Sequence, residues 1–251
     1  MSLPWSEACE ADATHVGSDR FAVADGSDEA DGSGARAIAA VLAAVDPFDP
    51  QGSLQRALRS SNWELWYRGG ATPDSRGVAT VTIAVWSGYR FTVGHVGDSR
   101  AYLVRGGRAH QLSSDHASPL TPEPTGAEPT GGQLGGPGGL GGLDGLGGLG
   151  GDSDVGVVRI GQRPGGWAPE VVSVAPEPGD RLLLCTDGMW RCASDAELAT
   201  AVGGVDPASA CRSLETHALF RASEAASAVV VAVEPGVAGD ARRDGARGGG
   251  R

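Results

Sequence analysis

The chain has 251 residues, with 31 acidic and 20 basic side chains, a formal net charge of -11, and no lysine. This length predicts one domain of ordinary size or two small ones. The negative charge argues against a surface for nucleic acid or anionic membrane, because such surfaces need clustered positive charge. No apolar run approaches the roughly 20 residues that span a bilayer.

The first residues contain neither the basic region nor the apolar region of a signal peptide. The four cysteines are too few and too irregularly spaced for a disulfide framework. We therefore expect a cytoplasmic protein in a reducing environment.

Glycine is the unusual residue type, with 41 in the chain, 13 of them within residues 131–151. Low-complexity sequence of this kind cannot pack a core. We therefore expect a single domain at 1–234, interrupted by a flexible Gly/Pro-rich insertion at 119–154, and a disordered tail at 235–251. The motif Gly145-x-Gly147-x-x-Gly150 lies inside this tract and is a chance match to a dinucleotide-binding pattern.

The residues before the insertion predict one strand, two helices and then three strands. Apolar residues at i, i+3, i+4 and i+7 indicate helices, and strict alternation indicates strands. In chain order, the predicted elements are a buried strand at 21–24, helices around 38–45 and 54–65, a hairpin with strands 81–85 and 89–95, and a strand at 101–104.

The residues after the insertion predict strands at 171–174, 181–185 and 228–233. Ser194 and Glu197 form the pattern of a capping box, which starts a helix. Asp206-Pro207 is the pattern of an N-cap followed by proline in the first helical position, and it starts a second helix. The order of these elements is typical of an α+β fold with mainly antiparallel pairing.

Two of the predicted buried strands run into an Asp-Gly pair, Asp25-Gly26 and Asp187-Gly188. A carboxylate held rigidly at the end of a buried strand suits a hard cation such as Mg²⁺ or Mn²⁺. Asp-Gly is also a common turn dipeptide, and either pair alone has that simpler interpretation.

The chain combines three motifs in a fixed order. The first is FAVADG at Phe21–Gly26, the second is Gly97-Asp98-Ser99-Arg100 followed by an aromatic strand and Asp115-His116, and the third is DRLLLCTDGMW at Asp180–Trp190. In this combination the chain resembles the PPM, or PP2C-type, metal-dependent protein serine/threonine phosphatases. The resemblance implies a four-layer α-β-β-α sandwich of two antiparallel sheets flanked by helices.

The resemblance also implies a mechanism, in which two Mn²⁺ or Mg²⁺ ions activate a water that attacks phosphoserine or phosphothreonine. The substrate would be a phosphorylated protein, the product of a serine/threonine kinase, and we expect a monomer. The site residues that the resemblance implies are Asp25 as the bridging carboxylate, the Gly26 carbonyl, Asp187 as a second ligand, and Asp12 and Glu224 as further ligands. Glu224 is equally well interpreted as a solvated glutamate at the end of a helix.

Asp12 is assigned from a register in which Ala11–Ala13 form a first strand, joined through His15–Ser18 to the strand that precedes Asp25. Asp19 is rejected as a ligand, because six residues of extended chain place it roughly 20 Å from Asp25. His15 is either a proton donor or an ordinary loop histidine.

Several residues depart from the family pattern. In this register the family's phosphate-binding arginine becomes Glu7 and its glutamate becomes Ala11, and an Asp-Asn pair becomes Glu224-Ala225. These departures leave open an inactive pseudophosphatase that acts as a binding or regulatory domain. The acidic run at 27–32 is either a source of outer-sphere ligands or a solvated loop, and Asp144, Asp152 and Asp154 are candidates for a third metal site.

Other residues of the motifs have structural interpretations. Asp98 and Arg100 are expected in a turn and a core network rather than as catalysts, and His116 is expected to be structural. The glycine tract lies where the family carries a flap over the active site, so we expect it to alter substrate specificity rather than metal chemistry.

Overall fold

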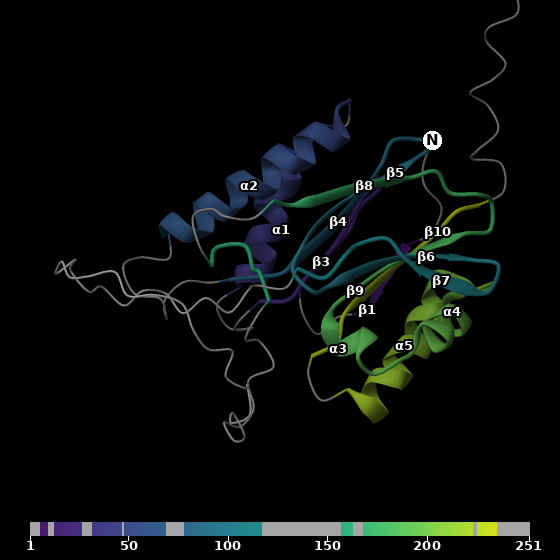
Figure 1. Cartoon of the computed structure of the whole chain (residues 1–251). Helices are drawn as coiled ribbons and strands as arrows, with labels where there is room; N and C mark the ends of the chain where they lie inside the picture. Colours follow the sequence, from purple (N-terminus) through teal and green to yellow (C-terminus); the bar gives the residue numbers. More distant parts are fainter. Residues whose placement is uncertain are drawn as a thin grey trace, which may run out of the picture.

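The computed structural model describes residues 6–9, 13–26, 32–46, 48–68, 78–116, 157–162, 168–222 and 225–234. These residues form two five-stranded antiparallel sheets packed face to face, with a pair of helices on the outer face of each (Figure 1). The α+β sandwich of four layers expected from the sequence is therefore confirmed.

The first sheet, called sheet B, is built around the predicted hairpin, in which Val81 pairs with Val96 and Trp86 pairs with Phe91. Its strands, in spatial order, are β2 (Ala13–Val16), β3 (Arg20–Ala24), β4 (Val81–Trp86), β5 (Phe91–Val96) and β8 (Glu170–Val174).

The second sheet, called sheet A, is centred on the apolar strand β9, which pairs with β10 on one side and β6 on the other. Its strands, in spatial order, are β1 (Ser6–Cys9), β10 (Ala228–Ala232), β9 (Arg181–Cys185), β6 (Arg100–Arg105) and β7 (Arg108–Gln111).

Two of the four long helices begin at the predicted caps, and the other two begin before the predicted ranges at 38–45 and 54–65. Helices α1 (Ser33–Ala44) and α2 (Pro50–Arg68) cover sheet B, and α4 (Asp195–Val202) and α5 (Pro207–Arg221) cover sheet A (Figure 1). The capping box of Ser194 and Glu197 is formed at the start of α4, and the Asp206 side chain accepts a hydrogen bond from the Ser209 N–H at the start of α5. A short helix, α3 (Asp187–Trp190), follows β9 directly.

Apolar side chains fill the three spaces between the four layers. Ile38, Leu54 and Ile83 belong to the cluster between sheet B and its helices. Phe21, Leu184 and Val229 belong to the cluster between the sheets, and Leu183 and Leu198 to the cluster between sheet A and its helices. The alternation of Leu183 and Leu184 shows how β9, a strand that is apolar on both faces, serves two layers.

Three elements were not predicted. Strand β7 is short and largely exposed, so it carries no apolar alternation. Strand β1 is fixed by pairing with β10, which is distant in the sequence, so it has no local signal. Helix α3 has only four residues, too few to show a helical period. Of the predicted first strand at 11–13, Ala13 is among the described residues, and it begins β2, which runs on to Val16. The turn from β2 to β3 is at Gly17–Asp19 rather than at the expected His15–Ser18. Among the described residues, no helix combines the length and the apolar character needed to cross a membrane.

Candidate metal centre

Strands of both sheets end at the same end of the sandwich, and aspartates follow them. Asp25 comes directly after β3, and the bridge between Gly26 and Ala79 places it beside the start of β4. Asp187 comes two residues after β9, whose last residue, Cys185, pairs with the first residue of β6. The starts of β4 and β6 are joined by a hydrogen bond between the hydroxyl groups of Thr80 and Ser99, so the two aspartates lie at one end of the molecule.

The backbone of Asp25 is fixed by Thr80. The Thr80 N–H donates to the Asp25 carbonyl oxygen at 2.8 Å, and the Asp25 N–H donates to the Thr80 hydroxyl oxygen at 3.1 Å. Asp19 lies at the other end of β3, where its carbonyl oxygen accepts a hydrogen bond from the Trp86 N–H. The rejection of Asp19 as a partner of Asp25 is therefore confirmed.

The Asp187 carboxylate is buried, with only 4% of the residue exposed. Its Oδ1 accepts a hydrogen bond of 2.8 Å from the Gly188 N–H. Position 188 requires glycine, because a Cβ there would collide with the carbonyl oxygen of Ala225. The β9–α3 turn is thus packed directly against the backbone that leads into β10.

Asp98 lies in the turn where the chain leaves sheet B and enters sheet A. The turn depends on Gly97, whose φ of 119° is in the left-handed region and whose Cβ would meet Thr80 at 2.6 Å. Asp98 is 6% exposed, and its carbonyl oxygen accepts a hydrogen bond from the Trp190 indole N–H at 2.8 Å. Burial raises the pKa of its carboxyl above the usual value, although Arg159 and Arg191 act in the opposite direction.

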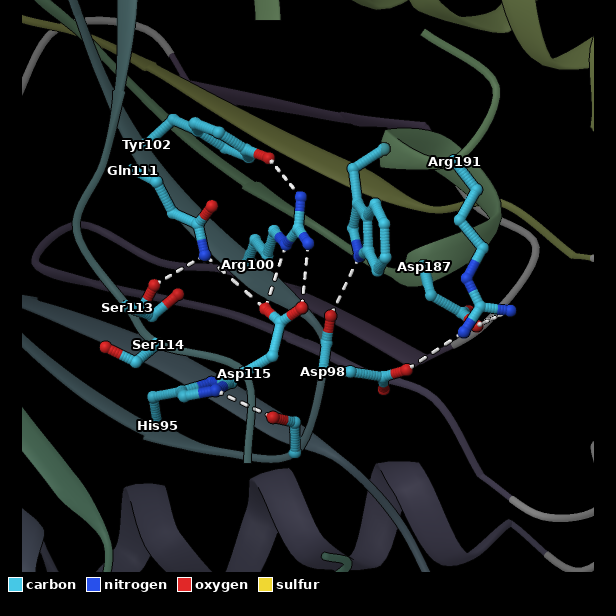
Figure 2. A network of polar contacts seen from close by, with 12 residues as sticks. His95, Asp98, Arg100, Tyr102, Gln111, Ser113, Ser114, Asp115, Asp187 and Arg191 are labelled. Atoms are coloured by element: carbon cyan, nitrogen blue, oxygen red, sulfur yellow. Dashed lines mark hydrogen bonds and ion pairs between the residues drawn. The ribbon is translucent and has the colours of Figure 1, made fainter. Parts of the chain in front are cut away.

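Arg191 joins Asp98 to Asp187 (Figure 2). Its Nη2 lies 3.3 Å from Oδ2 of Asp98, and its Nη1 lies 3.2 Å from Oδ2 of Asp187. The sequence-based prediction left Asp98 outside the site and overlooked Arg191. The available signal was the spacing of Asp187 and Arg191, since an acid and a base four residues apart form an ion pair if the segment is helical.

Arg100 and Asp115 form a structural network beside these aspartates. The Arg100 guanidinium donates from Nε and Nη2 to both oxygens of Asp115, at 2.9 and 2.7 Å, and from Nη1 to the Tyr102 hydroxyl (Figure 2). It also stacks 3.4 Å from the centre of the Trp190 ring. This contact set agrees with the predicted core-network role of Arg100.

Two stacked histidines support the Gly97 turn. His95 is fully buried, and its Nε2 donates to the Gly97 carbonyl oxygen at 3.0 Å, which leaves Nδ1 to accept from the Thr82 hydroxyl. Burial, followed by the nearby His116, lowers the pKa of His95 to about 3. Nδ1 of His116 accepts from the Gly97 N–H, so this histidine also has a structural contact.

His15 has neither of the roles considered from the sequence. It lies within β2, paired with Ala22, rather than in a loop. A Cβ on Gly17 would come within 3.0 Å of its Nε2, so the imidazole lies toward the turn and away from the strand end that carries Asp25.

Several predicted site residues lie outside the described residues. They are Ala11, Asp12, Glu224, residues 27–31 of the acidic run, and Asp144, Asp152 and Asp154. The whole insertion at 119–154 and the tail from 235 onward also lie outside the described residues. Glu7 lies in β1, opposite Val230. Within the described ranges, no three His, Cys, Asp or Glu side chains form a group that could hold a metal ion.

The described donors nevertheless suit a divalent metal chemically. Asp25, the Gly26 carbonyl and Asp187 all offer oxygen, the ligand atom that Mg²⁺ and Mn²⁺ prefer. A carboxylate provides about four lone-pair sites, so the contacts of Asp187 with Gly188 and Arg191 are compatible with metal ligation. Among the described residues, Asp25 and Asp187 are the carboxylates that would hold such an ion.

Comparison with known proteins agrees with this geometry. Residues 21–125 match the model of the family "Protein phosphatase 2C". The serine/threonine protein phosphatase PstP of Mycobacterium tuberculosis is 32% identical over 111 residues, which are 41% of this chain and 22% of PstP.

Solved structures share the fold over nearly the whole chain. The crystal structure of the Mycobacterium tuberculosis phosphatase PstP/Ppp covers 93% of this chain and 100% of its own, with a TM-score of 0.71 and 21% identity. The PstP catalytic domain in complex with two manganese ions covers 92% of this chain and 98% of its own, with a TM-score of 0.69 and 22% identity.

The chain is therefore similar to the PPM, or PP2C-type, phosphatases in sequence over residues 21–125, and it shares the fold of solved members over nearly its whole length. The matched region spans only about a fifth of the length of the curated PstP protein.

Proposed function

We propose that the chain is a metal-dependent phosphatase that hydrolyses phosphoserine and phosphothreonine in proteins. The observation that carries this proposal is that Asp25 and Asp187 lie at the same end of the sandwich, each after a strand of a different sheet. The two manganese ions in the PstP catalytic domain support a metal-dependent activity. Mn²⁺ and Mg²⁺ both suit oxygen ligands in fixed positions.

Asp12 and Glu224 complete the proposed ligand set. Asp12 precedes Ala13, and Ala13 pairs with Ala24, the residue before Asp25. Glu224 precedes Ala225, whose backbone packs against Gly188. The described neighbours of both acids are therefore at the end of the sandwich that carries Asp25 and Asp187.

When bound, the metal ions supply an activated water and neutralise charge that develops on the phosphoryl group. The protein chain holds the proposed ligands in position. Thr80 fixes the backbone of Asp25, and the Gly188 N–H orients the Asp187 carboxylate. A phosphorylated protein is the proposed substrate, and the monomeric state and cytoplasmic location proposed for the chain rest on the sequence alone.

The test is phosphate release from a phosphothreonine peptide in Mn²⁺ and in EDTA. Activity should require Mn²⁺, and Asp25→Asn and Asp187→Asn should each lower kcat/KM by about 100-fold or more. Asp19→Asn is the matched control, because Asp19 lies at the opposite end of β3. Far-UV circular dichroism confirms that each variant is folded, and unchanged turnover in Asp187→Asn would overturn the proposal.

A pseudophosphatase is the second candidate. It is favoured by the contact of Arg191 with Asp187 and by Glu7 and Ala11 in place of the family's arginine and glutamate. Calorimetry with Mn²⁺ separates the two candidates. A folded chain that binds no Mn²⁺ below millimolar concentration supports the pseudophosphatase, whereas occupancy by two ions excludes it.

A further inference from the structure

We infer that Arg191 is a built-in cation that holds Asp98 and Asp187 together and excludes a divalent metal ion from the space between these two carboxylates. The inference rests on the proposed function, because it concerns how many ions the proposed metal end accepts. Its geometric basis is one guanidinium that contacts Oδ2 of Asp98 at 3.3 Å and Oδ2 of Asp187 at 3.2 Å (Figure 2).

A cation between the two carboxylates stabilises both of them in the ionised form. Their side chains are only 8% and 5% exposed, and they come from separate segments, the turn after β5 and the turn after β9. Burial of two like charges close together costs free energy unless an opposite charge compensates it. Either a divalent ion bound by both oxygens or a guanidinium bonded to both can provide this charge.

Arg191 is held in this position by local structure. Its N–H donates to the Asp187 carbonyl oxygen at 2.9 Å, and Asp187 lies one helical turn before it on the same face. The neighbouring Trp190 binds the Asp98 carbonyl oxygen through its indole N–H. Hydrogen bonds other than the ion pairs therefore hold the backbones of all three partners, unlike those of an ordinary surface salt bridge.

The charge on Arg191 is permanent. A guanidinium stays protonated at every pH at which the protein is folded, so it does not leave the two carboxylates as the pH changes. Arg159 and Asp115 also act electrostatically on Asp98, with opposite signs. Because Arg159 remains when Arg191 is removed, the sharpest test replaces Arg191 with a third carboxylate rather than with alanine.

The experiment counts the Mn²⁺ ions bound per chain after equilibrium dialysis, by elemental analysis, and requires no substrate. We expect Arg191→Asp to bind one more ion than the unmodified chain, because residues 98, 187 and 191 would then offer three carboxylates. The double variant Arg191→Asp with Asp98→Asn should lose the extra ion. Arg191→Lys, which keeps a positive charge, should retain the original number.

The number of Mn²⁺ ions bound per chain tests this inference and the proposed function independently. If the unmodified chain binds no Mn²⁺ and Arg191→Asp binds one ion, the proposed function fails and the inference stands. If the unmodified chain binds two ions and Arg191→Asp also binds two, the inference is overturned and the proposed function stands.

A second measurement covers the case in which Arg191→Asp does not fold. A crystal of the unmodified chain grown in Mn²⁺ shows by anomalous scattering where the ions lie. Ions elsewhere at this end, with the Arg191 contacts intact, support the inference. An ion coordinated by both Asp98 and Asp187, with Arg191 displaced, contradicts it.

Discussion

The hydroxyl oxygens of Thr80 and Ser99 lie 2.6 Å apart and join the start of β4 in sheet B to the start of β6 in sheet A. Thr80 also accepts the Asp25 N–H, and Ser99 follows Asp98 in the chain. One short polar contact thus connects the backbone of the proposed bridging ligand to the segment that carries Asp98.

Replacement of Thr80 by valine should destabilise the fold and disturb the site. It leaves the buried Ser99 hydroxyl and the Asp25 N–H without this partner, which costs about 1–3 kcal/mol. Urea unfolding measures the loss, and Mn²⁺ affinity measures the displacement of Asp25. Thr200→Val is the control, since Thr200 bonds only within the exposed face of α4, and an equal loss in both variants would contradict the predicted role.

Gly188→Ala should lower the free energy of unfolding by about 3 kcal/mol, because its Cβ would collide with the backbone of Ala225, which cannot rotate away. Gly88→Ala is the matched control. Gly88 has a positive φ of 92° but open space around it, so its substitution brings backbone strain alone, about 1–2 kcal/mol. A smaller loss for Gly188→Ala than for Gly88→Ala would show that the turn adapts easily.

The strand ends and most of the helices could be predicted from the sequence because their signals are local. The apolar run before Asp187 and the capping box at Ser194 each specify an element within a few residues. The order of strands in each sheet is not local, and the pairing of β1 with β10 joins residues more than 200 positions apart. The four layers were expected from the family resemblance, whereas the order of strands within each sheet was not predicted.

The same distinction explains what the sequence missed at the site. Asp25 and Asp187 were identified because each follows an apolar strand. The part played by Asp98 depends on Arg191, and their contact joins residues that lie 93 positions apart. Neither residue type is unusual for a turn or a helix end, so only the packing of the two sheets shows that they meet.

Acidification should destabilise the chain from about pH 6.5 downward. The pKa of His95 is lowered to about 3 in the folded state and is near 6.5 when unfolded, so between these values the unfolded state binds the additional proton. Stability is therefore complete above pH 6.5 and falls as the pH drops, by a few kcal/mol in total. Burial also lowers the pKa of His116, which acts in the same direction.

Urea unfolding between pH 7 and pH 5 measures this slope, in a range where histidine titration dominates. His95→Gln should be less stable at pH 7 but should show a shallower slope. His110→Gln changes an exposed histidine on β7 and should keep the slope of the unmodified chain. Equal slopes in all three proteins would exclude His95 as the cause.

Deletion of residues 131–151 should change recognition of the substrate and leave the fold intact. These residues lie outside the described ranges, and the nearest described residues before and after them, His116 and residues 157–162, are hydrogen-bonded to each other or to the sheet. The Val158 N–H donates to the His116 carbonyl oxygen at 3.0 Å, and Ile160 pairs with Ala79. Because His116 and Val158 are already held together, shortening the chain between them changes the closure entropy by less than about 1 kcal/mol.

The described residues that flank this segment lie at the end of the sandwich that carries Asp25. Ala79 bridges to Gly26 on its other side, and Arg159 acts electrostatically on Asp98. The deletion should therefore raise or lower KM for a phosphothreonine peptide several-fold while kcat for p-nitrophenyl phosphate, a small substrate, stays constant. An unchanged peptide KM would exclude a role in specificity, and a loss of activity on both substrates would assign the segment to the catalytic site itself.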